Sequence, residues 1–179
     1  MAELDPTSIG SAFRFPLVVM DFEASALTLD SYPIEVGVAI ATTPSSSIET
    51  WSSLIASAPD WDHTSHWDPD AERIHGISRW DLRQGKTARE VMLVLIGLVG
   101  TNTQVWCDGG HYDAHWLQTL AQAAGFQRHF ELCDIGAAIR IDRLAFGRYL
   151  EALNKSVAPH RAGPDAERIC SALITLIQE

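Results

Sequence analysis

Apolar residues are concentrated in short runs that predict the strands of a covered sheet. Leu17–Met20 is apolar on both faces, which is typical of a strand buried above and below. Pro33–Thr42 and Ser47–Ala56 predict two further strands, and the "TTPSS" turn between them favours an antiparallel hairpin. Two later runs, Thr103–Asp108 and Phe130–Ile135, complete a set of five predicted strands.

Helical periodicity occupies most of the second half of the chain. We expect four helices there: Ala88–Gly100, Asp113–Ala124, one that follows the fifth strand to about Leu153, and one that begins at Pro164. A short helix is also expected to begin at Pro69, because proline followed by acids is a good helix start. Strands followed by alternating helices and strands predict an α/β protein with a central mixed sheet flanked by helices. We expect residues 1–14 to form a flexible segment and 15–179 a single domain.

The composition is that of a globular protein with an acidic surface. Hydrophobic residues make up 46% of the chain and charged residues 20%, which is enough to build a core. Thirteen basic residues against 23 acidic ones give a formal net charge of −10. This balance argues against coating of long duplex DNA through many basic contacts, but it allows an enzyme that holds a few phosphates through metal ions.

Cysteine content and the lack of targeting segments favour a cytoplasmic location. Cys107, Cys133 and Cys170 are odd in number and widely spaced, which fits a reducing compartment. The stretch "MAELDPTSIGSAF" has no basic region followed by an apolar one. The longest apolar run, Val91–Val99, is far shorter than the ~20 residues needed to cross a bilayer, so no membrane partner is expected.

Four acids occupy places from which they could meet at one edge of the sheet. Asp21 and Glu23 are two residues apart at the end of a strand and therefore point to the same side. Asp113 and Asp165 each lie at an expected helix start, where the helix dipole alone would explain an acid. Taken singly, each acid is most simply solvated. Together they form an oxygen-only ligand set of the kind that selects Mg²⁺ or Mn²⁺.

With these motifs in order, the chain resembles the DEDDh 3′–5′ exonucleases, the superfamily of polymerase proofreading subunits, RNase T and oligoribonuclease. "DFE" gives Asp21 and Glu23, "HYDAHWL" gives Asp113, and "HRAGPDA" gives His160 and Asp165. "YPIEVGVA" and "ERIHGIS" also match elements of these enzymes. Two stretches, "ASAL" and "CDGG", depart from the family pattern where the terminal nucleotide would be held.

The resemblance implies an RNase H-like fold and removal of nucleotides from 3′ ends of single-stranded or short DNA or RNA. It implies two Mg²⁺ or Mn²⁺ ions held by the four acids, with His160 as the general base. An imidazole suits that role because it titrates near neutral pH. Ala24, Ser25, Leu27 and His75 are the residues expected to contact substrate. By analogy with RNase T and oligoribonuclease, a homodimer is also expected.

Several other interpretations stay open at this level. His111 and His115 have a spacing that could bind zinc from one helix face. "HWDPD", residues 66–70, competes with "HRAGPD" as the third motif. Arg161, Arg168 and Lys155 are candidates for phosphate contacts. From another class, the chain could be a catalytically silent nucleic-acid-binding or partner subunit on the same fold.

Overall fold

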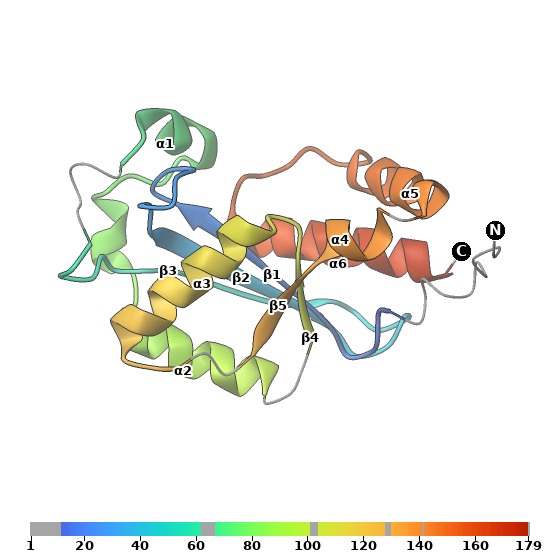
Figure 1. Ribbon diagram of the computed structural model, residues 1–179, viewed down its shortest axis with the longest axis horizontal. Coiled ribbons are helices and arrows are strands. Elements are labelled where there is room, and N and C mark those ends of the chain that lie inside the picture. Colours follow the sequence, from blue (N-terminus) through green and yellow to red (C-terminus); the bar gives the residue numbers. More distant parts are fainter. Residues whose placement is uncertain (1–11, 62–66, 101–103, 128–129, 141, 179) are drawn as a thin grey trace.

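Five strands form one mixed sheet in the order β3-β2-β1-β4-β5. The computed structural model describes residues 12–61, 67–100, 104–127, 130–140 and 142–178. β2 pairs with β1 and β3 in antiparallel register, whereas β4 pairs in parallel with both β1 and β5. The strands are β1 Leu17–Ala24, β2 Pro33–Ala41, β3 Glu49–Leu54, β4 Gln104–Cys107 and β5 Glu131–Asp134 (Figure 1). The predicted five-stranded mixed sheet is confirmed.

Helices cover both faces of this sheet. They are α1 Pro69–His75, the 3₁₀ helix η2 Asp81–Gln84, α2 Ala88–Val99, α3 His111–Ala124, α4 Ile135–Ile139, α5 Arg143–Leu153 and α6 Ala162–Gln178. The single helix expected to reach Leu153 is therefore wrong, because the segment contains two helices. The side chain of Asp142 explains the second start, since it accepts hydrogen bonds from the N–H groups of Leu144 and Ala145.

The last helix begins at Ala162, two residues before the predicted start at Pro164. The side chains of Glu35 and Asp165 satisfy backbone N–H groups at this start. Glu35 accepts from the N–H of Ala162 at 3.0 Å, and Asp165 accepts from that of Arg161 at 3.1 Å. The capping partner from β2 is distant in sequence, so a local pattern could not reveal it.

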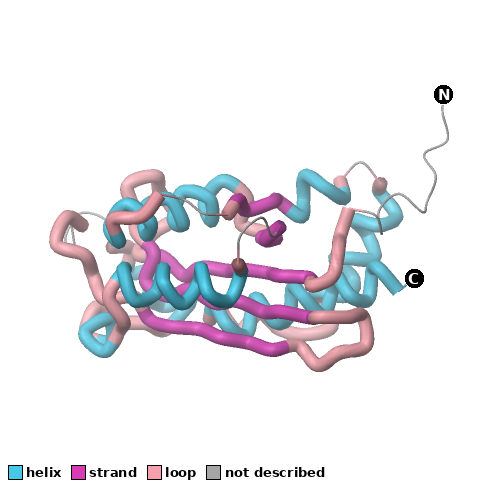
Figure 2. Tube along the Cα trace, turned by 90° about the horizontal axis from the view of Figure 1, so that it is seen from below, coloured by secondary structure: helices cyan, strands magenta, loops and turns pink. Residues whose placement is uncertain are grey.

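Alternation along β1 divides the core into two layers. Val18 and Met20 pack with α2 and α3, whereas Leu17 and Val19 pack with α5 and α6. Figure 2 shows the long strands side by side with helices on either side of them. Phe13, within the segment expected to be flexible, is buried with its ring centroid 4.5 Å from that of Trp106, and residues 1–11 lie outside the described part.

Helix α6 lies very close to β2. A Cβ added to Gly37 would be 2.2 Å from the backbone of Ala162, so only glycine permits this approach. A Cβ on Gly163 would in turn lie 2.9 Å from the side chain of Ser52. The close approach fixes the first turn of α6 above the centre of the sheet. In the described residues, no helix is long and apolar enough to cross a membrane.

Candidate active site

The end of β1 carries the first two acids of the site. Because side chains alternate along a strand, Asp21 and Glu23 continue the face of Leu17 and Val19, which α6 covers. Opposite Asp21 on β2 stands Gly37, which has no side chain to occupy the same space. The alternation that buries the start of β1 thus delivers two carboxylates to the place where α6 begins.

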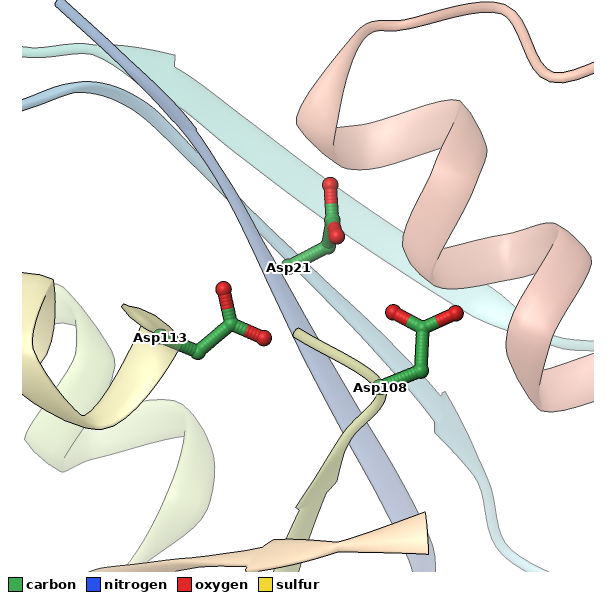
Figure 3. Close-up of side chains that lie close together, drawn as sticks. All are labelled: Asp21, Asp108 and Asp113. Carbon is green, nitrogen blue, oxygen red and sulfur yellow. The ribbon is translucent and has the colours of Figure 1, made fainter. Parts of the chain in front are cut away.

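Asp108 reaches the same place from the end of β4. β4 is parallel to β1, with Val19 beside Trp106. Continuing this register by two residues places Asp108 level with Asp21. Figure 3 shows their carboxylates close together with that of Asp113, from three different elements. The carboxyl ends of two parallel strands therefore contribute directly to one acidic cluster.

Asp113 lies in the first turn of α3 and is 1% exposed. Its Oδ2 accepts a hydrogen bond from the N–H of Gly109 at 3.0 Å. A Cβ on Gly109 would lie 2.6 Å from this carboxylate, and Gly110 has a φ of 59°. The two glycines of "CDGGHYD" therefore let the chain fold back over the acid as it turns from β4 into α3.

Asp165 lies in the first turn of α6 and faces the end of β1. Its Oδ2 accepts the hydrogen bond from the N–H of Arg161, and its Oδ1 forms an ion pair with Nε of Arg168 at 3.2 Å. Arg168 also donates to the carbonyl of Leu153 at 3.0 Å. These contacts fix the orientation of the Asp165 carboxylate.

An ion pair between an exposed arginine and a buried glutamate ties the segment before α6 to β2. Glu35, which is 3% exposed, accepts from Nε of Arg161 at 2.9 Å and from Nη2 at 2.6 Å. Such a two-bonded guanidinium–carboxylate pair has a fixed geometry. Arg161 and Arg168, two of the candidates for phosphate contacts, are therefore both engaged with carboxylates of the protein. Lys155, the third candidate, is exposed.

The acids form two groups that could each hold a metal ion. Asp21, Asp108 and Asp113 offer oxygens within 4.8 Å of one another, and so do Asp21, Glu23 and Asp165. Asp21 belongs to both groups and stands between them. The donor sets contain only carboxylate oxygens, which suit hard divalent cations such as Mg²⁺ and Mn²⁺. Because like charges at this spacing repel, the crowded carboxylates need either cations or protons to neutralise them.

Burial and, after it, this repulsion raise the pKa values of the acids. Loss of hydration, followed by the charge of Asp113, raises the pKa of Asp21 well above its usual range. Burial and then the charge of Asp165 raise the pKa of Glu23 to about 8. Burial and the charge of Asp108 raise the pKa of Asp113 to about 7. Without a cation, the site therefore retains protons near neutral pH.

A groove passes over the carboxylates toward α1. The part over the acids has a volume of about 270 Å³, and the part beside α1 about 430 Å³. Glu23, Leu27, Trp116 and His160 border both parts, so the two are continuous. A ligand lying in this groove would touch the acids at one end and the wall formed by α1 at the other.

His160 borders the groove just ahead of α6. It is exposed and has a φ of 53°, in the left-handed region that few residues other than glycine adopt. The next residue is Arg161, which the ion pair with Glu35 holds in place. A backbone in this conformation persists only where its surroundings enforce it, and such residues are concentrated at functional sites.

The residues predicted to contact substrate occupy two kinds of position. Ala24, Leu27 and His75 border the part of the groove beside α1. Leu27 is 67% exposed, and so is available to an incoming ligand. Ser25 is buried, and its Oγ accepts a hydrogen bond from the N–H of Tyr32 at 3.1 Å. The structure thus places Ser25 inside the turn that supports the groove.

The alternative zinc ligands lie outside the acidic clusters. Nε2 of His115 is 3.3 Å from the carbonyl oxygen of Ser31, and the ring of His111 packs on Tyr112. Among the residues that the structure describes, the groups able to hold a metal contain carboxylates only. Nothing in this arrangement favours a histidine zinc site.

The two candidates for the third motif are separated by their positions. Asp165 joins the carboxylates of β1, whereas Asp70 is exposed on α1 and forms an ion pair with Arg73. His66, the histidine of the competing motif, lies outside the described residues. The six residues "PDAERI" occur twice in the chain, at 69–74 and 164–169. The two copies differ in setting, because Pro69 begins α1 but Pro164 is the third residue of α6.

Two residues of the site were not predicted from the sequence. Asp108 is the last residue of a predicted strand, and a parallel pairing of that strand with β1 would have indicated its position. Glu35 gave no such signal, since an acid in a strand normally predicts an exposed position. Its burial depends on Arg161, 126 residues later in the chain.

The fold is that of DEDD-family 3′-exonucleases, an RNase H-like architecture. No protein-family model matches this sequence, and no curated protein sequence does either. In three dimensions the likeness covers about nine tenths of the chain.

Three solved structures illustrate the likeness. A 3′-exonuclease in a structure of 3′-end specific recognition of the histone mRNA stem-loop has a TM-score of 0.71 at 17% identity, over 93% of this chain and 65% of that one. Cell-death related nuclease 4 (CRN-4) has a TM-score of 0.69 at 15% identity, over 92% and 64%. The zinc-bound ExoI–ssDNA complex of E. coli has a TM-score of 0.65 at 14% identity, over 90% and 40%. This chain thus spans two fifths to two thirds of their lengths.

Proposed function

We propose that the protein is a divalent-metal-dependent 3′–5′ exonuclease that removes nucleotides from single-stranded or short DNA or RNA. The observation that carries the proposal is the sharing of Asp21 between two carboxylate groups that border one groove. A phosphodiester is an anion, and such a site can accept it only after cations neutralise the acids. The fold shared with 3′-exonucleases supports the same conclusion.

The chain's residues fit two hard cations. Asp21, Asp108 and Asp113 would hold one Mg²⁺ or Mn²⁺, and Asp21, Glu23 and Asp165 the other. When bound, these ions supply positive charge to the phosphate and make a water molecule more acidic. The protein orients the carboxylate oxygens that would bind these ions. The N–H of Gly109 holds the carboxylate of Asp113, and the N–H of Arg161 and the side chain of Arg168 hold that of Asp165.

His160 is proposed as the general base. It borders the cavity over the acids and would accept a proton from the attacking water as the new bond to phosphorus forms and the 3′ oxygen leaves. The ion pair between Arg161 and Glu35 holds the backbone beside it, so the ring has a fixed point of attachment. This role belongs to the protein alone and does not depend on which cation is bound.

The terminal nucleotide would lie in the part of the groove beside α1. Ala24, Leu27 and His75 would contact it, with the exposed Leu27 side chain against a base. Ser25 would act indirectly, by holding the turn through Tyr32. A homodimer remains a prediction by analogy, which light scattering of the purified protein can check.

The test is a parallel digest of matched DNA and RNA oligonucleotides with free and blocked 3′ ends in Mn²⁺. We expect a ladder of products shortened from the free 3′ end, resistance of blocked ends, and no product from Asp21→Asn. His160→Ala should lower kcat by a factor of roughly 10²–10⁴. Glu151→Gln, an exposed acid on α5, is the matched control and should behave as wild type.

Two outcomes would contradict the proposal. Cleavage of blocked and free substrates at equal rates would indicate an endonuclease. No product from any substrate, with binding retained, would favour the catalytically silent binding subunit.

A further inference from the structure

Positive side chains are concentrated in one stretch of this acidic protein. Five of its 13 basic residues lie between positions 73 and 89, and all five are exposed: Arg73, Arg79, Arg83, Lys86 and Arg89. In a chain of net charge −10, such a local concentration marks a surface that attracts an anion. Arg73 is already paired with Asp70, which leaves the segment after α1 as the basic surface.

Two of these arginines border a cavity. Arg79 and Arg83 line a hollow of about 340 Å³ together with Ser57, while Tyr32 and Leu82 supply the apolar part of its lining. Two guanidinium groups and a hydroxyl are donors that suit phosphate oxygens. The cavity is therefore chemically unlike the groove, whose polar lining over the active site is acidic.

Exposed aromatic surface accompanies the positive charge. Cζ of Arg83 lies 4.1 Å from the ring centroid of Trp80, and Cζ of Arg79 lies 5.1 Å from that of Trp67. Trp80 is 65% exposed, so most of this large apolar side chain contributes nothing to the core. Guanidinium groups beside an accessible indole are the combination with which proteins hold the phosphates and bases of single strands.

These arginines differ from those beside the acids in what they already contact. Arg161 and Arg168 are engaged with Glu35 and Asp165. Across the stretches of chain that the structure describes, Arg79 and Arg83 make aromatic contacts but no ion pair with a carboxylate. Their guanidinium groups therefore retain hydrogen-bonding capacity for a ligand.

Short stretches of chain connect the basic cavity to the groove. His75 borders the groove at the end of α1, and Arg79 follows after only three intervening residues. Tyr32, which lines the cavity, donates its N–H to Ser25 in the turn that supports the groove. These links place the cavity on the parts of the chain that follow α1 and the turn beside the groove, within the path we propose for a bound single strand.

We propose that Arg79, Arg83 and Trp80 form a second contact for single-stranded nucleic acid, which binds the strand on the 5′ side of the end held in the groove. The placement of the 3′ end rests on the function proposed above. The recognition chemistry is that of guanidinium with phosphate and indole with base.

Binding of labelled single strands with hydrolysis-resistant linkages in Mn²⁺ tests this without turnover, because the cation neutralises the acids and the linkages resist cleavage. Two probes are compared, a dinucleotide and an oligonucleotide of about 12 nucleotides, which is a usual length for the binding site of a single strand. The double variant Arg79→Ala/Arg83→Ala should bind the longer strand roughly tenfold more weakly or worse. Its plot of log K against log salt should be less steep by about 1.4, since each phosphate contact on a single strand contributes about 0.7. Dinucleotide binding should not change.

Matched variants separate charge from stacking. Arg143→Ala removes an exposed arginine from α5 and should bind as wild type. Trp80→Ala should weaken binding of the longer strand by roughly fivefold or more with an unchanged salt slope. A double variant with the affinity and salt slope of Arg143→Ala would overturn the proposal.

A second binding experiment tests whether the basic surface instead binds an acidic protein partner. Polyglutamate that binds wild type but not the double variant, while strand binding is unaffected, would also overturn the proposal. Strand binding that depends on Arg79 and Arg83 in a protein that cleaves nothing would support this surface and contradict only the exonuclease function. Cleavage that requires Asp21 but is unchanged in the Arg79→Ala/Arg83→Ala variant at every strand length would support the exonuclease function and contradict only this surface.

Discussion

Asp21 connects the two halves of the candidate site, because its carboxylate belongs to both acidic groups. Each group takes its other members from different parts of the fold, the first from the end of β4 and the first turn of α3 and the second from β1 and α6. Loss of Asp21 therefore affects both groups, whereas loss of another acid affects one. The predictions for single residues follow from this difference.

Asp108→Asn should weaken the first metal group only. The amide keeps the volume but removes one charged oxygen, so we expect Mn²⁺ affinity there to fall by at least about tenfold, comparable to the loss of a supporting carboxylate. Calorimetric titration measures this effect. Asp134→Asn is the control, since Asp134 lies nearby on β5 but outside both groups. Equal losses in the two variants would contradict a ligand role for Asp108.

The raised pKa values predict how stability depends on pH in EDTA. Asp113 and Glu23 hold protons up to about pH 7 and 8 in the folded protein, but ordinary carboxyls ionise near pH 4 when unfolded. As pH rises, these carboxyls lose their protons at lower pH in the unfolded state than in the folded state. The free energy of unfolding therefore falls as pH rises toward about 7 and 8. Urea unfolding between pH 5 and 9 should show this loss, and Asp113→Asn should flatten it. A wild-type profile that rises over this range would contradict the prediction.

Most acids of the site could be predicted from the sequence because each lies in a local pattern. Asp21 and Glu23 end a strand, and Asp113 and Asp165 begin helices. Asp108 was missed because its role depends on which strand lies beside β4, a property of the whole sheet. Nothing in the sequence indicated that the side chain of Ser25 is buried and bonded to the backbone of Tyr32, since this contact forms only when the intervening turn folds.

At the scale of elements, the approach of α6 to β2 positions the third motif. Gly37 permits this approach and stands beside Asp21 on the neighbouring strand. The sequence predicted both elements but not their separation, and therefore placed the start of the helix two residues late. The ion pair of Glu35 with Arg161 forms only once the two elements meet.

Gly37→Ala should disturb both stability and the site. The added methyl would overlap the backbone of Ala162, so we expect a loss of about 1–3 kcal/mol in unfolding free energy and weaker Mn²⁺ binding. Gly97→Ala is the matched control, because nothing lies within 4 Å of that position in α2. It should raise helix stability by up to about 1 kcal/mol and leave metal binding unchanged. A Gly37→Ala protein as stable as wild type would show that the contact is not tight.

At the scale of the molecule, a chain of charge −10 presents an acidic candidate site and a basic surface after α1. Composition alone indicated that many basic contacts were absent. It could not indicate that the remaining basic residues are grouped, because their exposure and the cavity between them arise from the packing of η2 and the loop before it. Fold class, in contrast, followed directly from the order of strands and helices.

Divalent cations should stabilise the whole molecule through the acidic site. At 100 times its Kd, Mn²⁺ should add about 2.7 kcal/mol to the unfolding free energy for each site. Asp21→Asn should lose most of the resulting rise in Tm, and Glu151→Gln should keep it. The measurement is thermal unfolding at constant ionic strength, with NaCl replacing MnCl₂ in the reference. Equal shifts in all three proteins would indicate non-specific binding.

The most direct measurement is anomalous diffraction from crystals grown with Mn²⁺. Convergence of the acids predicts two anomalous peaks, one among Asp21, Asp108 and Asp113 and one among Asp21, Glu23 and Asp165. Peaks at other surfaces of the protein, or an acidic cluster without any peak at saturating Mn²⁺, would contradict the account.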